Sequence, residues 1–284
     1  MTMPLTCFKV ETANKIAHVQ LSRPEAFNAM NRAFWNELPE IINEISDKGA
    51  ARVIVISSTG KHFCAGMDLS VFTDGQGSAA PPQNAEHGRA RANMRDHVKH
   101  LQDAFSCMDR ARMPVLMAIQ GGCVGGAVDM STCADMRYAT KDAFFVIQEI
   151  NLAMTADVGT FPRLCHLLPQ GMLRELAYTG RRLMAHRAYE LGLVNALYDS
   201  QEEMHKDVLA TAAEIAAKSP LAVLGSKVMI NYARDHSIQD GLDYIATWQA
   251  GMYNPGVDMM ESFKAKAEKR EAVYADLLPL RKVM

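Results

Sequence analysis

Three acidic residues in the middle of the chain have the surroundings that proton-transfer chemistry needs. Asp129 follows a glycine-rich stretch, Glu149 follows the apolar run Phe-Phe-Val-Ile, and Asp157 lies in the sequence Ala-Asp-Val-Gly. Apolar neighbours raise the pKa of a carboxyl group because they disfavour its charged form. Such groups can act as base and acid near neutral pH. Each also has a structural interpretation: Asp129 or Asp157 stabilises a helix start, or Glu149 pairs with an arginine.

Two segments place small residues just before a predicted helix. One is Phe63–Leu69 (FCAGMDL) and the other is Gly121–Asp129 (GGCVGGAVD). The first N–H groups of a helix have no partner inside it, so they can stabilise an anionic oxygen. Two such junctions facing one point would form an oxyanion hole, although glycines at one junction are also explained by close helix packing. Neither segment fits a dinucleotide fingerprint or a Walker A loop.

Hydrophobic periodicity predicts an α/β arrangement for the first 200 residues. Alternating apolar residues predict a hairpin, and short apolar runs predict buried parallel strands. In chain order we expect a hairpin over 6–21 that turns at Asn14, a helix capped by Asn31, a strand over 53–57, a helix over about 93–110, and strands over 115–119, 136–139 and 144–146.

The sequence divides into two regions by the kind of element it predicts. Residues 1–200 form the α/β core, whereas residues 201–284 form a helical region with apolar surface for the core or a neighbouring subunit. The expected helices cover 201–217, 221–234, 237–252 and 255–276. Residues 73–91 are rich in Gly, Pro, Ser and charge, which predicts a surface loop or a mobile lid.

Composition excludes several classes of protein. The net charge of −2 argues against nucleic acid as the main partner, and no apolar run is long enough to span a membrane. Six scattered cysteines fit neither a zinc site nor a disulfide framework. His97 and His100 would need a further ligand to bind a metal, so we expect no metal site. Without a recognisable signal or transit peptide, the expected location is the cytoplasm.

Four segments together resemble the crotonase (enoyl-CoA hydratase/isomerase) superfamily. They are residues 22–29 (SRPEAFNA), 63–69, 119–129 and 143–164, and the resemblance extends from about residue 8 to residue 270. It implies a spiral of ββα repeats followed by a helical trimerisation region. It also implies an acyl-CoA substrate, no separate cofactor, and a homotrimer or homohexamer.

The resemblance also implies a binding site for the thioester. The backbone N–H groups of Ala65 and Gly126 would polarise the thioester carbonyl, with Gly66, Met67 and Asp68 beside them. The segment from Phe27 to Ala29 would contact the CoA nucleotide. Enolate stabilisation is the chemistry that this superfamily shares.

The pattern of acidic residues is most similar to the Δ3,5-Δ2,4-dienoyl-CoA isomerases. By that resemblance Glu149 removes a proton at C2 of the acyl chain, Asp157 delivers one at C6, and Asp129 orients or tunes the site. The reverse order of the two proton transfers stays open. The alternatives are enoyl-CoA hydration, another acyl-CoA reaction, and a noncatalytic or RNA-binding role.

Overall fold

The larger of two β-sheets forms the centre of the fold. The computed structural model describes residues 4–73, 86–252 and 256–281. Within them, six strands lie in the order β1 (Phe8–Ala13), β2 (Ile16–Leu21), β3 (Val53–Ser58), β4 (Val115–Ile119), β6 (Met136–Thr140) and β9 (Ala196–Tyr198). The β1–β2 hairpin is antiparallel and turns at Asn14 as predicted, and the other pairs are parallel. The continuous apolar runs of β3 and β4 are buried along their whole length because both faces of the sheet are covered.

A smaller sheet repeats the chain path beside the first. It consists of β5 (Gly122–Val124), β7 (Phe144–Val146) and β8 (Leu183–Met184). The chain passes from β4 to β5, then through a helix to β6 and on to β7, so successive turns add one strand to each sheet. A bridge between Cys64 and Cys123 extends this path to the preceding turn. The predicted ββα spiral is therefore confirmed.

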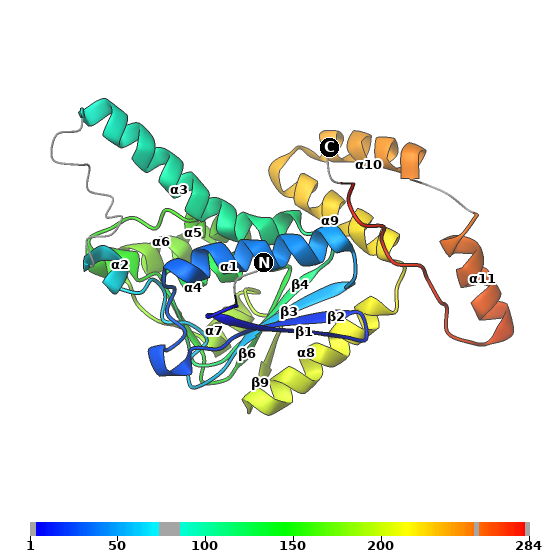
Figure 1. Ribbon diagram of the computed structural model, residues 1–284, viewed down its shortest axis with the longest axis horizontal. Helices are drawn as coiled ribbons and strands as arrows, with labels where there is room; N and C mark the ends of the chain where they lie inside the picture. Colours follow the sequence, from blue (N-terminus) through cyan, green and yellow to red (C-terminus); the bar gives the residue numbers. More distant parts are fainter. Residues whose placement is uncertain (1–3, 74–85, 253–255, 282–284) are drawn as a thin grey trace.

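Helices cover both faces of the larger sheet. On one face α1 (Arg32–Lys48) packs beside α3 (His87–Arg110), and on the other α8 (Gln201–Ala216) covers a second apolar cluster (Figure 1). Asn31 caps α1 as predicted, since its side chain accepts a hydrogen bond from the N–H of Phe34 at 3.0 Å. The short helices are η1 (Pro24–Ala26), α2 (Ser70–Thr73), α4 (Gly126–Thr132), η2 (Glu149–Leu152), α5 (Thr160–Leu167), α6 (Gln170–Thr179) and α7 (Ala185–Glu190).

The predicted loop over 73–91 is partly helical. Residues 74–85 lie outside the described part of the chain, but α3 begins already at His87. The carboxylate of Glu86 accepts hydrogen bonds from the N–H groups of Gly88 and Arg89, at 2.7 and 3.1 Å. This cap extends the helix six residues before the predicted start at 93, which corrects the sequence interpretation.

The C-terminal region contains α8, α9 (Pro220–Asp235), α10 (Ile238–Met252) and α11 (Asp258–Glu268), with α10 and α11 at the edge of the molecule (Figure 1). No single helix in the described ranges is long and apolar enough to cross a membrane; only α8 and α9 taken together, bent by 107°, pass on length and composition.

The last helix ends at Glu268 and not at 276 as predicted. Lys269 adopts the left-handed conformation at its C-terminus, with φ of 52°. The following segment runs back to the sheet, where Arg52 donates to the carbonyl of Tyr274 and the carboxylate of Asp276. These tertiary hydrogen bonds hold the segment away from a helical path.

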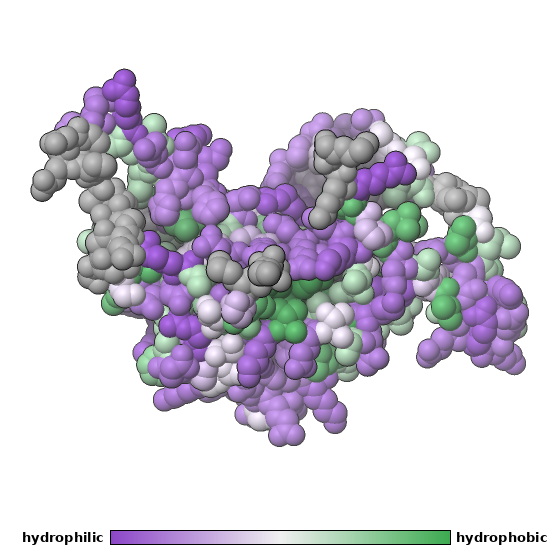
Figure 2. All heavy atoms as spheres, in the orientation of Figure 1, coloured by the Kyte–Doolittle hydropathy of each residue, from purple (hydrophilic) through white to green (hydrophobic). Residues whose placement is uncertain are grey.

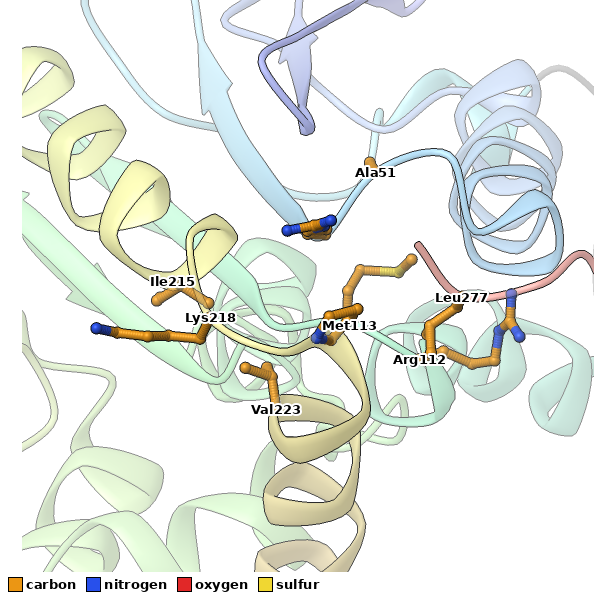
Figure 3. Close-up of a pocket in the computed structure, with 9 residues that line it drawn as sticks. Ala51, Arg112, Met113, Ile215, Lys218, Val223 and Leu277 are labelled. Atoms are coloured by element: carbon orange, nitrogen blue, oxygen red, sulfur yellow. The ribbon is translucent and has the colours of Figure 1, made fainter. Parts of the chain in front are cut away.

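The C-terminal segment meets the core at a shallow pocket. Leu277 lies there beside Ala51, Met113 and Val223, which come from both regions of the chain (Figure 3). None of the three candidate carboxylates lines it. This pocket is a junction between elements and lies apart from the candidate chemistry.

A buried lysine fixes α9 to the core. The side chain of Lys227 is 4% exposed, and its Nζ donates to the carbonyls of Met108 and Met113 and to the carboxylate of Asp135, at 2.8, 3.0 and 2.8 Å. Asp135 also accepts from the N–H of Val115 at the start of β4. The ammonium group of Lys227 therefore links α9 to the end of α3 and, through Asp135, to the start of β4.

Replacing Lys227 with Met is expected to lower the free energy of unfolding by about 1–3 kcal/mol, because it leaves two backbone carbonyls and the partly exposed carboxylate of Asp135 without their buried donor. Urea denaturation measures this. The control is Lys48→Met, which breaks an exposed pair with Glu44 and should cost less than about 1 kcal/mol. Equal costs for the two variants would contradict the assigned role of Lys227.

Candidate active site

Glu149 lies at the start of η2, directly behind the glycine turn. The N–H of Gly125 donates to the carbonyl of Val146 at 2.9 Å, which places the turn beside the end of β7. Gly125 has φ of 54°, and a methyl group on it would lie 3.2 Å from Oε1 of Glu149. Glycine is required here because it allows both the backbone conformation and the close approach of the carboxylate.

Asp129 is buried in the first turn of α4, and its carboxylate reaches a different helix. Its Oδ1 accepts hydrogen bonds from the N–H and the hydroxyl of Thr160, at 2.6 and 2.7 Å. Its Oδ2 is buried and has no hydrogen-bond partner among the described residues. The carboxylate thus stabilises the start of α5 and not the start of its own helix.

Asp157 lies in the loop that precedes α5. Its backbone carbonyl accepts a hydrogen bond from the side chain of Gln102 on α3, at 2.7 Å. The first residue before α5 is Gly159, and no side chain caps the helix from that position. The alternative that Asp157 is a helix cap is therefore wrong, and the residue as a whole is exposed in the single chain although its carboxyl group is partly buried.

The three carboxyl groups share an environment that raises the pKa of each. Burial is the main cause, and it raises the pKa of Glu149 to about 7 and that of Asp129 to about 6. The charge of Asp129 further raises the pKa of Glu149, and the charge of Asp157 acts on both. Partial burial likewise raises the pKa of Asp157. The structure brings together the three residues that the sequence singled out.

Cations do not neutralise this cluster directly. Among the described residues, none of the three carboxylates forms an ion pair with Lys or Arg, so the predicted alternative that Glu149 pairs with arginine is not observed. The charge of Arg163 lowers the pKa of Asp129 only as the smallest of several effects, and its guanidinium is bound to Asp109 at 2.7 Å and to Ser106 at 2.9 Å. An unpaired, partly buried carboxyl group is suited to proton transfer near neutral pH.

The backbone beside this cluster offers two N–H groups, but one differs from the prediction. The N–H of Ala65 donates to the carbonyl of Phe27 at 3.0 Å, so the predicted use of this group in an oxyanion hole is wrong. The N–H groups of Met67 and Gly126 have no hydrogen-bond partner within the described part of the chain. They are the donors that remain for a substrate oxygen.

Close packing of the two junctions explains the glycine at position 66. A methyl group on Gly66 would lie 2.5 Å from the carbonyl oxygen of Val124 and 3.6 Å from the nitrogen of Gly126. The hydrogen bonds from Met30 N–H to Gly66 and from Asp68 N–H to Met30 fix the strand-like path of Met67 between them. The two glycine junctions therefore meet, as the sequence predicted.

The other residues predicted to contact the substrate have different surroundings in the structure. Phe27 is 52% exposed and lies against His62, with ring centroids 5.6 Å apart. The carbonyl of Ala29 is held by Arg23. The carboxylate of Asp68 accepts from Ser70 at the start of α2, which lowers the pKa of Asp68 and gives that side chain a local structural role. Contact of Phe27 and Ala29 with CoA stays a prediction.

Sequence reasoning missed two residues that hold this site. Thr160 and Gln102 bind Asp129 and the Asp157 carbonyl, respectively. A threonine after a glycine at a helix start is a recognisable signal, but its partner is 31 residues away. In the described residues, no three His, Cys, Asp or Glu side chains are grouped to hold a metal.

An apolar pocket lies beside η2 and the loop that leads to Asp157. It has a volume of about 410 Å³, and its walls come from η2, the following loop, α5 and α6. Its lining includes Ile150, Met154, Ala156, Phe161, Leu173 and Tyr178. An apolar pocket of this kind is typical of a site that binds an apolar ligand or a partner protein.

Comparisons with known proteins agree with this geometry. The chain is 41% identical to the mitochondrial Δ(3,5)-Δ(2,4)-dienoyl-CoA isomerase of Mus musculus, over 93% of the chain and 80% of that protein. It is 36% identical to the peroxisomal protein of that name in Arabidopsis thaliana, over 96% of the chain and 97% of that protein. These relatives are named for mitochondria and peroxisomes, and a cytoplasmic location for this chain stays a prediction.

Solved structures share the fold. An enoyl-CoA hydratase from Bacillus anthracis superposes with a TM-score of 0.82 at 26% identity and covers 95% of this chain and 99% of its own. An enoyl-CoA hydratase from Polaromonas sp. JS666 superposes with a TM-score of 0.80 at 24% identity, over 94% and 99%. The family model for enoyl-CoA hydratase/isomerase matches residues 11–277. The chain therefore belongs to the enoyl-CoA hydratase/isomerase family.

Proposed function

We propose that this protein converts 3,5-dienoyl-CoA to 2,4-dienoyl-CoA. The observation that carries the proposal is the cluster of Asp129, Glu149 and Asp157 beside two backbone N–H groups without protein partners. The relatives named as dienoyl-CoA isomerases support the choice of substrate. The reaction moves protons and double bonds without oxidation, so it needs no cofactor beyond the CoA of the substrate.

The thioester oxygen would accept hydrogen bonds from the N–H groups of Met67 and Gly126. These donors stabilise the negative charge that develops on this oxygen when the C2 proton leaves. Gly126 begins α4, so its N–H also carries the positive end of the first helical turn. Mutagenesis of comparable donors in other enzymes indicates about 3 kcal/mol for each.

Two carboxyl groups would then exchange protons with the acyl chain. Glu149 takes the C2 proton, the electron pair spreads through the conjugated system to C6, and Asp157 gives a proton to C6. The double bonds move from positions 3 and 5 to positions 2 and 4, and the enzyme returns to its starting protonation by proton exchange. In the reverse assignment Asp157 takes the C2 proton and Glu149 gives a proton to C6, and the protons balance in the same way because one carboxyl starts ionised and the other protonated.

Self-association is part of this proposal. In the described residues of α10 no side chain is buried, and the apolar Ile238, Leu242 and Ile245 are 85%, 58% and 42% exposed. In the view of Figure 2, most of the surface at α10 is hydrophilic or of intermediate hydropathy, with a few apolar residues among them. Apolar side chains at this helical spacing form a face that is stable only when covered, and a second copy of the chain offers the apolar pocket behind η2. A trimer or hexamer stays a prediction.

Asp157→Asn is expected to lower kcat for dienoyl-CoA isomerisation by about 10²–10⁴, because the amide cannot give up a proton to C6. The measurement follows the ultraviolet absorbance of 2,4-dienoyl-CoA formed from 3,5-dienoyl-CoA. Asp142→Asn, at an exposed carboxylate outside the cluster, is the matched control and should behave as the wild type. No conversion by the wild-type protein, with hydration of an enoyl-CoA instead, would replace the isomerase proposal by the hydratase alternative.

The pH dependence of kcat/KM should be bell-shaped, because the shuttle needs one carboxyl protonated and its partner ionised. Glu149 holds the last proton of the cluster, with a pKa raised to about 7, so activity should fall as pH rises through about 7. At low pH activity falls again, when no ionised base remains. Glu149→Gln should remove the basic limb and lower kcat. A wild-type rate that rises through pH 7 would show that the C6 proton comes from elsewhere.

Leu242→Lys is expected to reduce the molecular mass of the particle in solution, because a charge on the exposed face of α10 opposes its burial in an interface. Light scattering after size-exclusion chromatography measures the mass. Leu209→Lys changes an exposed leucine on α8 and serves as the control. A wild-type protein that is already monomeric would contradict the self-association proposal.

A further inference from the structure

One pair of residues connects the two halves of the proposed active site. The Oδ1 atom of Asp129 accepts from both the N–H and the hydroxyl of Thr160, at 2.6 and 2.7 Å, and both residues are about 1% exposed. Asp129 belongs to α4 and Thr160 begins α5. A doubly bound carboxylate in a buried position is a strong and directional link because its hydrogen bonds are charge-assisted.

Each of the two linked residues lies close in sequence to a group with a proposed role in the reaction. Asp129 is three residues after Gly126, whose N–H is a proposed oxyanion donor. Thr160 is three residues after Asp157, which is proposed to serve C6. One carboxylate therefore relates the position of the thioester oxygen to the position of the distal proton donor.

The loop before α5 needs this link because its own residues do not supply a cap. Gly159, at the position before the helix, has no side chain and adopts φ of 135°. The other fixed point of the loop is the carbonyl of Asp157, which Gln102 of α3 binds at 2.7 Å. Without Asp129, the N–H of Thr160 at the start of α5 would lack a partner. The hydrogen bond from Gln102 of α3 would then be the remaining one of the two that fix the loop.

We infer that Thr160 is a positioning residue which, through Asp129, holds the Asp157 loop at a fixed distance from the oxyanion hole. This inference rests on the proposed function for its effect on catalysis, but the clamp itself is a property of the fold. A displacement of about 1 Å at a reacting group is enough to cost about a hundredfold in rate. Substrate binding depends on CoA contacts elsewhere, so the effect should fall on kcat.

The test compares Thr160→Val, Thr160→Ser and Thr132→Val. Thr160→Val keeps the shape of the side chain but removes the hydroxyl donor, and it should lower kcat by about 10–100-fold while KM changes by less than about threefold. Thr160→Ser restores the hydroxyl and should recover most of the activity. Hydrogen exchange of residues 156–160 should be faster in Thr160→Val than in the wild type.

Thr132→Val is the matched control. Thr132 lies on α4 and is buried as Thr160 is, and its hydroxyl donates to the backbone carbonyl of Asp129 at 2.7 Å, so Thr132→Val removes a buried hydroxyl hydrogen bond of the same length without touching α5. A wild-type kcat in Thr160→Val, or an equal loss in both valine variants, would overturn the inference. If the wild-type protein does not isomerise dienoyl-CoA, the proposed function fails while the exchange rates still decide whether the clamp exists.

Discussion

Burial of ionisable carboxyl groups without a cation is the constraint on which this site depends. Asp129 and Glu149 lie where water is largely excluded, and each has one oxygen without a hydrogen-bond partner among the described residues. An ion pair would hold the carboxylates ionised and lower their pKa values, which would remove the proton that an isomerisation must transfer. The positive charge of Arg163 acts on Asp129 only weakly, and its guanidinium is paired with the carboxylate of Asp109. The cluster thus keeps a high proton affinity because, among the described residues, no Lys or Arg forms an ion pair with its carboxylates.

That constraint explains why glycine is needed at two different places. At position 125 glycine admits the carboxylate of Glu149, and at position 66 it lets the first junction approach the carbonyl of Val124. A side chain at either place would separate the acidic groups from the backbone donors. Since both glycines also have positive φ, no other residue would meet the steric and conformational requirements together.

Sequence patterns predicted the parts of the molecule that local physics determines. The hairpin, the Asn31 cap and the buried strands β3 and β4 follow from periodicity and composition within a few residues. The predictions failed where the local conformation depends on hydrogen bonds with residues far away in the sequence. The N–H of Ala65 is bound by Phe27, the last helix ends early where Arg52 binds the following segment, and Thr160 is bound by Asp129. A strand of three residues, β5, was hidden in a glycine-rich stretch because its pairing with β7 comes from the tertiary fold.

The two kinds of chemistry in the proposed mechanism are placed on different kinds of structure. The backbone donors lie on segments fixed by strand-like bridges, between Met30 and Met67 and between Cys64 and Cys123. The two carboxylates proposed to transfer protons, Glu149 and Asp157, lie on a 3₁₀ helix and on a loop. Substitutions on loops cost less stability than changes in paired strands, so the proton-transfer groups can vary while the oxyanion donors stay in place. A fold shared by hydratases and isomerases is expected from this division, because the shared step uses backbone and the differing step uses side chains.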